Sequence, residues 1–238
     1  MEDSVEQPSG FSEARARVIA LFVLGVAVTT FIYSLTKPEF PKEPSENQRA
    51  LLKAAQIGDI PAIHAALRAG ADVNAVDGTG YSALHIAVRA QHVESARCLL
   101  RHGAHVDAIQ VAVGTPLALA SVNGDLPMVR LLLDAGAGLE SKTAAGFCPL
   151  YAAVQGDAAP VAELLLKAGA NPNCRVTDGT TPLMVAAAHG QAGIACDLLE
   201  HGADPARVTK TGQTALTEAL NADCPHIVRM LQRALHQM

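Results

Sequence analysis

Leucine, alanine and glycine recur at a fixed period along most of the chain. A leucine stands at six equally spaced positions, namely Leu51, Leu84, Leu117, Leu150, Leu183 and Leu216, and their spacing of thirty-three positions defines the repeat period. An alanine follows each leucine three positions later, and Gly-Ala pairs recur at the same period from Gly70-Ala71 to Gly202-Ala203. Several series that share one phase, with no insertion between them, indicate a repeat architecture.

One unit shows which elements this pattern predicts. Thr181 is a suitable N-cap, and Pro182 suits the first turn of a helix that Gly190 is expected to end. A second helix is expected from about Gln191 to His201, with Gly202 closing it. Two short helices cannot bury their own apolar faces, so each unit must stack on its neighbours.

These units resemble ankyrin repeats, whose signature is T-P-L-H-x-A followed by a glycine, a leucine-rich second helix and Gly-Ala. The matching segments are Ser82-Ala83-Leu84-His85-Ile86-Ala87, Thr115-Pro116-Leu117, Cys148-Pro149-Leu150, Thr181-Pro182-Leu183 and Thr214-Ala215-Leu216. The resemblance implies an all-α solenoid of helix-turn-helix units with short β-hairpin loops. Its six expected repeats over residues 44–238 are 44–76, 77–109, 110–142, 143–175, 176–208 and 209–238. The first and last depart from the pattern and suit capping units, and Val113 replaces a turn glycine in the third.

A long apolar segment precedes the repeats. Val18 to Thr36 contains nineteen residues without a charge, and eleven of them are valine, isoleucine, leucine or phenylalanine. A helix of that length is about 28 Å long, close to the thickness of a bilayer core. We therefore predict one transmembrane helix over 18–36, after a tail over 1–17 and before a proline-rich linker over 37–48.

Two other interpretations of the segment stay open. A cleaved signal peptide would use Arg15 and Arg17 as its charged start, but the residues after Val28 offer no convincing cleavage site. A buried core helix is the other, although an apolar run without a polar face is unusual in soluble proteins. The membrane anchor is the favoured interpretation.

Charges near the segment leave its orientation balanced. Arg15 and Arg17 flank one side, while Lys37 and Lys42 flank the other. Short N-terminal tails commonly stay in the cytoplasm, which would place the repeats outside it; scattered thiols and the family's usual intracellular habitat favour the cytosol instead. An alanine-rich composition with more arginine than lysine points to a bacterial source. We expect a single-pass protein of the bacterial inner membrane with periplasmic repeats, and cytosolic repeats are the alternative.

Composition excludes several classes of protein. The chain is 50% hydrophobic and 17% charged, which excludes a disordered polypeptide. Its net charge of −5 offers no basic excess for nucleic acid. Because tryptophan is absent and aromatic residues make up 3%, small alanines rather than large rings must let the helices pack closely.

Five cysteines lie far apart, and none belongs to a C-x-x-C pair. An odd number without tight spacing indicates neither a disulfide framework nor a zinc site. Buried or idle thiols are therefore expected at Cys98, Cys148, Cys174, Cys196 and Cys224.

Motifs of catalysis are missing. The chain contains no phosphate-binding G-x-x-x-x-G-K, no H-E-x-x-H and no G-x-S-x-G. We expect no enzyme activity, no cofactor and no small-molecule substrate. His85 is expected to be a hydrogen-bonded structural residue, and His102 and His201 to lie at the C-terminal ends of second helices, where a cation complements the helix dipole. We expect His102 and His105 to bind no metal.

The resemblance also implies where a partner binds, because in the family the hairpin tips and first helices line a concave groove for other proteins. Tyr81 and Phe147 occupy the same place in two repeats, and Ile109 and Val111 are apolar where a loop favours polar residues. Such residues rimmed by basic ones are typical of an interface centre. The candidate partner-binding residues are Tyr81, Arg89, Ile109, Val111, Phe147, Tyr151, Arg175, Thr180 and Lys210. The alternative is that Tyr81, Phe147 and especially Tyr151 cover the core between repeats.

The predicted function is a membrane-tethered scaffold for protein–protein interaction, without catalysis of its own. Its expected partners are one or more proteins and, through Val18–Thr36, the lipid bilayer. Residues outside the repeats are too few to hold an active site. Two alternatives stay open: a docking or regulatory subunit of an enzyme complex, and a bacterial effector or antagonist protein.

Overall fold

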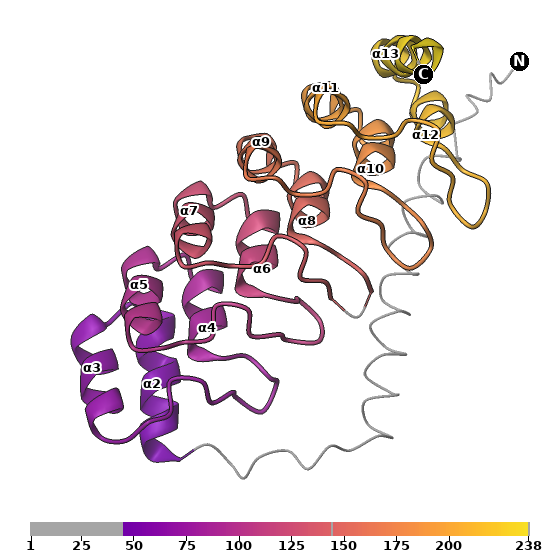
Figure 1. The fold of residues 1–238 in the computed structure, drawn as a ribbon. Coiled ribbons are helices and arrows are strands. Elements are labelled where there is room, and N and C mark those ends of the chain that lie inside the picture. Colours follow the sequence, from indigo (N-terminus) through magenta and orange to yellow (C-terminus); the bar gives the residue numbers. More distant parts are fainter. Residues whose placement is uncertain (1–44, 144, 238) are drawn as a thin grey trace, which may run out of the picture. The chain divides into compact units, whose positions relative to one another are not determined.

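A computed structural model describes residues 45–143 and 145–237. Its helices form consecutive antiparallel pairs, and Figure 1 shows the pairs stacked so that first and second helices make two rows. The first helices are α2 (Glu46–Ile57), α4 (Ala83–Arg89), α6 (Pro116–Val122), α8 (Pro149–Gln155), α10 (Pro182–Ala188) and α12 (Ala215–Asn221). The second helices are α3 (Ile60–Arg68), α5 (Val93–Arg101), α7 (Leu126–Asp134), α9 (Ala159–Lys167), α11 (Ala192–Glu200) and α13 (Pro225–His236).

Each first helix begins after a residue whose side chain caps it. Thr181 caps α10, its side-chain oxygen accepting from the backbone N–H of Met184 at 3.4 Å, and Pro182 is the first helical residue, as predicted. The helix ends at Ala188, and its partner α11 covers Ala192–Glu200. The predicted bounds of both helices are therefore correct to within two residues.

Small residues allow the close packing of the two rows. The periodic alanines are buried in every pair, with exposed fractions from 0% to 2% at Ala54, Ala87, Ala120, Ala153, Ala186 and Ala219. The leucines three positions before them are equally buried as far as Leu183, whereas Leu216 is only partly buried because no further helix pair packs on α12 within the described residues. The core is thus continuous across neighbouring pairs, as a stacked array requires.

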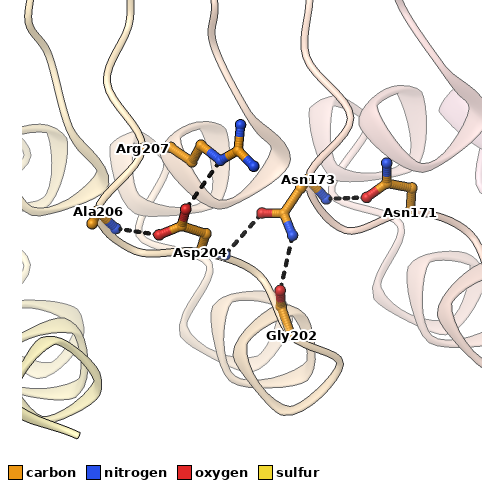
Figure 2. Close-up of polar contacts among 6 residues, drawn as sticks. All are labelled: Asn171, Asn173, Gly202, Asp204, Ala206 and Arg207. Carbon is orange, nitrogen blue, oxygen red and sulfur yellow. Dashed lines mark hydrogen bonds and ion pairs between the residues drawn. The ribbon is translucent and has the colours of Figure 1, made fainter. Parts of the chain in front are cut away.

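Side-chain hydrogen bonds join the loops of successive pairs. Asn173 donates from Nδ2 to the Gly202 carbonyl at 2.9 Å and accepts the Asp204 N–H on Oδ1 at 2.8 Å (Figure 2). Asp204 in turn accepts from the Ala206 N–H at 2.9 Å and from the Arg207 Nε–H at 3.0 Å. One amide side chain therefore satisfies backbone groups of the next loop, which fixes the spacing of the two pairs.

The same pair of hydrogen bonds occurs three repeat periods earlier in the chain. Asn74 donates to the Gly103 carbonyl at 3.1 Å and accepts from the His105 N–H at 2.7 Å. In the next pair a carboxylate serves instead, since Asp107 accepts the Gly138 N–H at 3.0 Å. These polar links repeat with the helices, so they belong to the fold and not to a binding site.

The hairpin that lacks the usual turn glycine closes normally. Gln110 and Gly114 exchange backbone hydrogen bonds of 2.9 and 2.7 Å, the pairing that Asp77 and Tyr81 share in part in the preceding hairpin. The Gln110 side chain accepts the N–H groups of Ala112 and Val113 at 2.7 and 2.8 Å. Gly114 adopts the positive φ of 81° that the turn requires. A side chain and a glycine one position later thus replace the missing residue.

Two of the five cysteines contradict the expectation of idle thiols. Cys148, the N-cap of α8, and Cys174, in the loop after α9, form a disulfide with their Cα atoms 6.8 Å apart. Both are buried, and stacking of adjacent hairpins brings them together across 26 residues of sequence. Cys98, Cys196 and Cys224 are free thiols.

The predicted transmembrane helix lies outside the described residues. Among the residues described, no helix combines the length and the apolar character that a membrane span needs. The expectation for Val18–Thr36 therefore stays a prediction.

Candidate partner-binding surface

The hairpin loops project from the row of first helices on one side of the array, one beside another (Figure 1). We call this side the hairpin face and define it by the loops 76–81, 109–114, 145–147, 175–180 and 208–213, together with Arg89 and Val122, which occupy the same repeat position on their first helices. Ile109 and Val111, both predicted as partner contacts, are 63% and 51% exposed here. Two aliphatic side chains in one loop are thus left in solvent by the packing of this chain.

Tyr81 lies half-buried at the base of the second repeat's hairpin. Its ring meets the ring of His85 edge to face, with centroids 6.0 Å apart, and the guanidinium carbon of Arg89 stands 4.7 Å from the Tyr81 centroid. Arg89 itself is exposed at the end of α4. Tyr81 therefore covers the core and also presents, with Arg89, a cation–π pair to solvent.

His85 is the structural residue that the sequence predicts. It is 1% exposed, with Nδ1 2.9 Å from the Ser82 hydroxyl and Nε2 3.1 Å from the Gly114 carbonyl. A neutral ring that donates from Nε2 and accepts on Nδ1 satisfies both partners. Burial lowers the pKa of His85, although the Gly114 carbonyl and Asp77 oppose this.

Asp77 organises the turn before Tyr81. Its Oδ1 accepts the N–H groups of Thr79 and Tyr81 at 2.8 and 3.0 Å and the Thr79 hydroxyl at 2.6 Å. Burial alone would raise the pKa of Asp77, but these hydrogen bonds and the nearby Arg89 together lower it. The carboxylate is thus held ionised as a turn residue.

Phe147 and Tyr151 form the corresponding pair in the fourth repeat. Their ring centroids are 5.1 Å apart, and Phe147 is half-buried against the core. Tyr151 is only 7% exposed, and burial, with a contribution from Asp178, raises its pKa to about 12. A side chain so buried has little surface for a partner, which favours the alternative that Tyr151 covers the core between repeats.

The basic residues of the predicted set lie on the same face. Arg175 and Lys210 are exposed in adjacent loops, which a 2.8 Å hydrogen bond from the Lys210 N–H to the Asp178 carbonyl joins. Thr180 is half-buried and donates its N–H to the Asp178 side chain at 2.8 Å. Arg175 and Lys210 thus lie free to meet an acidic group, while Thr180 chiefly closes its turn.

Sequence reasoning missed two aliphatic residues on this face. Val208 stands three repeat periods after Ile109, at the same position of a later hairpin, and is 57% exposed. Val122 stands one repeat period after Arg89 and is 38% exposed at the end of α6. The repeat period itself is the signal that identifies both.

The histidines at the ends of second helices lie away from the hairpin face. His102 and His201 occupy the C-caps of α5 and α11, as predicted, with Nδ1 2.9 and 2.8 Å from the carbonyls of Cys98 and Asp197. The expectation that His102 and His105 bind no metal overlooks Cys98, which precedes His102 by four residues and lies on the same helix face.

Comparison with known families supports the resemblance seen in the repeats. A family model described as ankyrin repeats, three copies in length, matches residues 26–110, 110–176 and 150–236. The first match begins within the segment predicted to span the membrane. None of the curated proteins compared with the chain matches it significantly.

Proposed function

Because the chain belongs to the ankyrin-repeat family, we propose that it is a membrane-tethered module that binds another protein on its hairpin face and carries no catalysis of its own. The observation that carries this proposal is the exposure of four aliphatic side chains on that one face: Ile109, Val111, Val122 and Val208. Exposed apolar residues gathered on one side of a folded domain mark a surface for association.

The neighbouring charges indicate what kind of partner fits. Arg89, Arg175 and Lys210 are exposed on the same face as the aliphatic residues. Interfaces commonly place apolar and aromatic groups at the centre and charged groups at the rim. The partner surface is therefore expected to be apolar at its centre and acidic at its edge.

The tether and its orientation rest on the apolar segment and on the disulfide. Val18–Thr36 has the length and composition of a single membrane span. The Cys148–Cys174 disulfide supports an oxidising compartment for the repeats, because reducing cytosol keeps thiols reduced. We therefore propose that the protein is anchored in a bacterial inner membrane, with its repeats in the periplasm.

Binding by the hairpin face is tested with matched pairs of exposed residues. Ile109→Ser with Val111→Ser removes aliphatic surface from the face. Ile57→Ser with Leu220→Ser removes side chains of similar exposure, 59% and 58%, from elsewhere in the array. After crosslinking in intact cells, the first pair is expected to lose the partner and the second pair to retain it. Equal loss, or no loss, from both would remove the hairpin face as the binding surface.

Topology is tested separately with a tag at the C-terminus. Protease added to intact cells should leave the tagged repeats whole, and opening the outer membrane alone should make them cleavable. Alkaline extraction should leave the wild-type chain in the membrane pellet and release a variant carrying Leu24→Arg and Val28→Arg. Cleavage only after lysis of the inner membrane would place the repeats in the cytosol instead.

A further inference from the structure

Three side chains on the opposite row of helices come together in a way that the partner surface does not use. His64 of α3, Cys98 of α5 and His102 at the end of α5 each offer one nitrogen or sulfur atom, and these three atoms lie within 4.8 Å of one another. The Cys98 sulfur is 3.7 Å from His64 Nε2 and 3.9 Å from His102 Nδ1. Within the described residues this is the one such group of three.

From this geometry we propose that His64, Cys98 and His102 bind one zinc ion, with water as the fourth ligand. Zinc–sulfur and zinc–nitrogen bonds of about 2.3 and 2.05 Å at a tetrahedral angle separate the two ligand atoms by about 3.6 Å. The observed separations of 3.7 and 3.9 Å require only small side-chain movements to match this. A thiolate with two imidazoles suits zinc and softer transition ions, whereas magnesium and calcium require oxygen ligands.

Burial of the three residues suits a metal that solvent reaches from one side. Cys98 is 7% exposed, His64 is half-buried and His102 is exposed. The thiol thus lies at the bottom of the site, and the exposed histidine leaves room for a water ligand. In the metal-free chain the Nδ1 of His102 donates its proton to the Cys98 carbonyl at 2.9 Å, which holds the ring close to the thiol. Zinc binding through Nδ1 would replace this hydrogen bond, and the ring proton would then lie on Nε2.

The fold does not itself require these residue types. The equivalent positions in the following helix pairs, each one repeat period further on, hold Arg97, Leu131 and Ala135, then Arg130, Leu164 and Ala168, then Glu163, Asp197 and His201, and then Cys196, Met230 and Ala234. Arginine, leucine and alanine build the same helix pair without any ligand. The trio at the first two pairs is therefore a local feature, and a bound ion would tie α3 to α5.

One equivalent position offers a matched control. His201 caps α11 with the same bond to a backbone carbonyl that His102 makes at the end of α5, 2.8 against 2.9 Å. Its partners at the equivalent positions are Glu163, which pairs with Lys167, and Asp197. Replacing His201 thus reproduces the loss of the cap without touching the proposed site.

The test uses the reduced full-length protein in detergent, with cobalt as the spectroscopic probe. Cobalt should give the visible bands of a tetrahedral ion and a near-ultraviolet thiolate charge-transfer band, and zinc should displace it at one ion per chain. Competition against a chromophoric chelator then gives the zinc affinity. His64→Ala, Cys98→Ser and His102→Ala should each weaken it at least about tenfold. His201→Ala and Cys196→Ser should leave it unchanged.

Several results would overturn the proposal. A cobalt spectrum without a thiolate band, an affinity unchanged by Cys98→Ser, or equal weakening by His201→Ala each excludes the site. If a variant fails to fold, the proposal is tested on the wild-type chain alone, by the rates at which its cysteines are alkylated. Zinc, but not magnesium, should slow alkylation of Cys98 at least about tenfold while alkylation of Cys196 continues at the same rate. Equal rates at Cys98 with and without zinc would reject the site.

Discussion

The second and fourth repeats present different side chains from the same backbone positions. Tyr81, His85 and Arg89 of the second correspond, two repeat periods on, to Phe147, Tyr151 and Gln155 of the fourth. In the second repeat the buried His85 hydrogen-bonds to two neighbouring residues. Above it, the guanidinium of Arg89 lies over the ring of Tyr81. In the fourth, a buried tyrosine lies below a phenylalanine, next to a disulfide.

This difference separates the buried side chain at each site from the side chain that solvent can reach. Position 85 or 151 accepts either a hydrogen-bonded ring or a packed aromatic ring, because both fill the space beneath the hairpin. The residue above it, Tyr81 or Phe147, remains half-exposed in both cases. The buried member therefore supports the fold, and the upper member is available to a partner.

The largest expected effect comes from removing the buried ring of the fourth repeat. Tyr151→Ala should lower the free energy of unfolding by about 3 to 4 kcal/mol, because a 7% exposed aromatic side chain leaves a cavity. Tyr81→Ala, the same substitution at a half-buried ring, should cost about 1 to 2 kcal/mol. Urea unfolding of the full-length protein measures both, and equal losses would contradict the assignment of Tyr151 to the core.

The next largest effect concerns a glycine that the fourth repeat has and the second repeat lacks. Gly156 ends α8 where the second repeat has Ala90, and a Cβ at 156 would lie 2.2 Å from the Val122 carbonyl oxygen. Gly156→Ala should therefore destabilise the protein by about 2 to 3 kcal/mol. The reverse change, Ala90→Gly, should cost about 0.5 kcal/mol. Thermal unfolding of the two variants side by side would show a comparable shift if the contact with Val122 did not matter.

The two buried rings should also respond to opposite ends of the pH scale. Burial lowers the pKa of His85 below 6.5, so the unfolded chain takes up its proton first as the pH falls. The stabilisation is complete above about pH 6.5 and is lost as the pH falls through the folded-state pKa. Tyr151, with a pKa of about 12 against an ordinary 10, holds its proton longer when folded, so stability falls as the pH rises above 10.

Conservative variants separate these two effects. His85→Gln should flatten the acid side of the stability profile, and Tyr151→Phe should flatten the alkaline side. Unfolding followed from about pH 4.5 to 12 covers both titration ranges. A profile whose acid side stays unchanged in His85→Gln would show that another group causes the loss there.

The smallest effect belongs to the exposed cation–π pair. Arg89→Ala should cost about 0.5 kcal/mol, since the guanidinium over the Tyr81 ring is solvated. Gln155→Ala removes the equivalent side chain of the fourth repeat and should change stability by less than about 0.3 kcal/mol. A double-mutant cycle with Tyr81→Phe and Tyr81→Ala measures the coupling, which should vanish only when the ring is removed.

Much of the helix array could be predicted from the sequence because the period fixes it. Caps such as Thr181, and the buried role of His85, follow from local chemistry at positions the repeat identifies. The disulfide could not be predicted, since Cys148 and Cys174 meet only when two hairpins stack. Tyr151 and Phe147 are both aromatic, but Tyr151 lies on the buried side of α8 whereas Phe147 precedes that helix in the hairpin and stays half-exposed.

The missed residues divide in the same way. Val208 and Val122 were open to prediction from the period alone, through Ile109 and Arg89. The Cys98–His102 spacing of four could also be recognised as one helical turn. The part played by His64 could not be recognised from the sequence, because His64 lies one helix pair earlier and comes close to Cys98 and His102 only when the two pairs stack.

Protein binding by the hairpin face is best examined by site-specific photocrosslinking in intact cells. A photoreactive phenylalanine analogue would replace Ile109, Val208 or, as the matched control, Leu220, side chains 63%, 57% and 58% exposed. We expect 109 and 208 to crosslink to the same partner protein and 220 not to. An adduct of equal yield from 220, or none from 109 and 208 in chains expressed at the same level, would show that partners do not bind through this face.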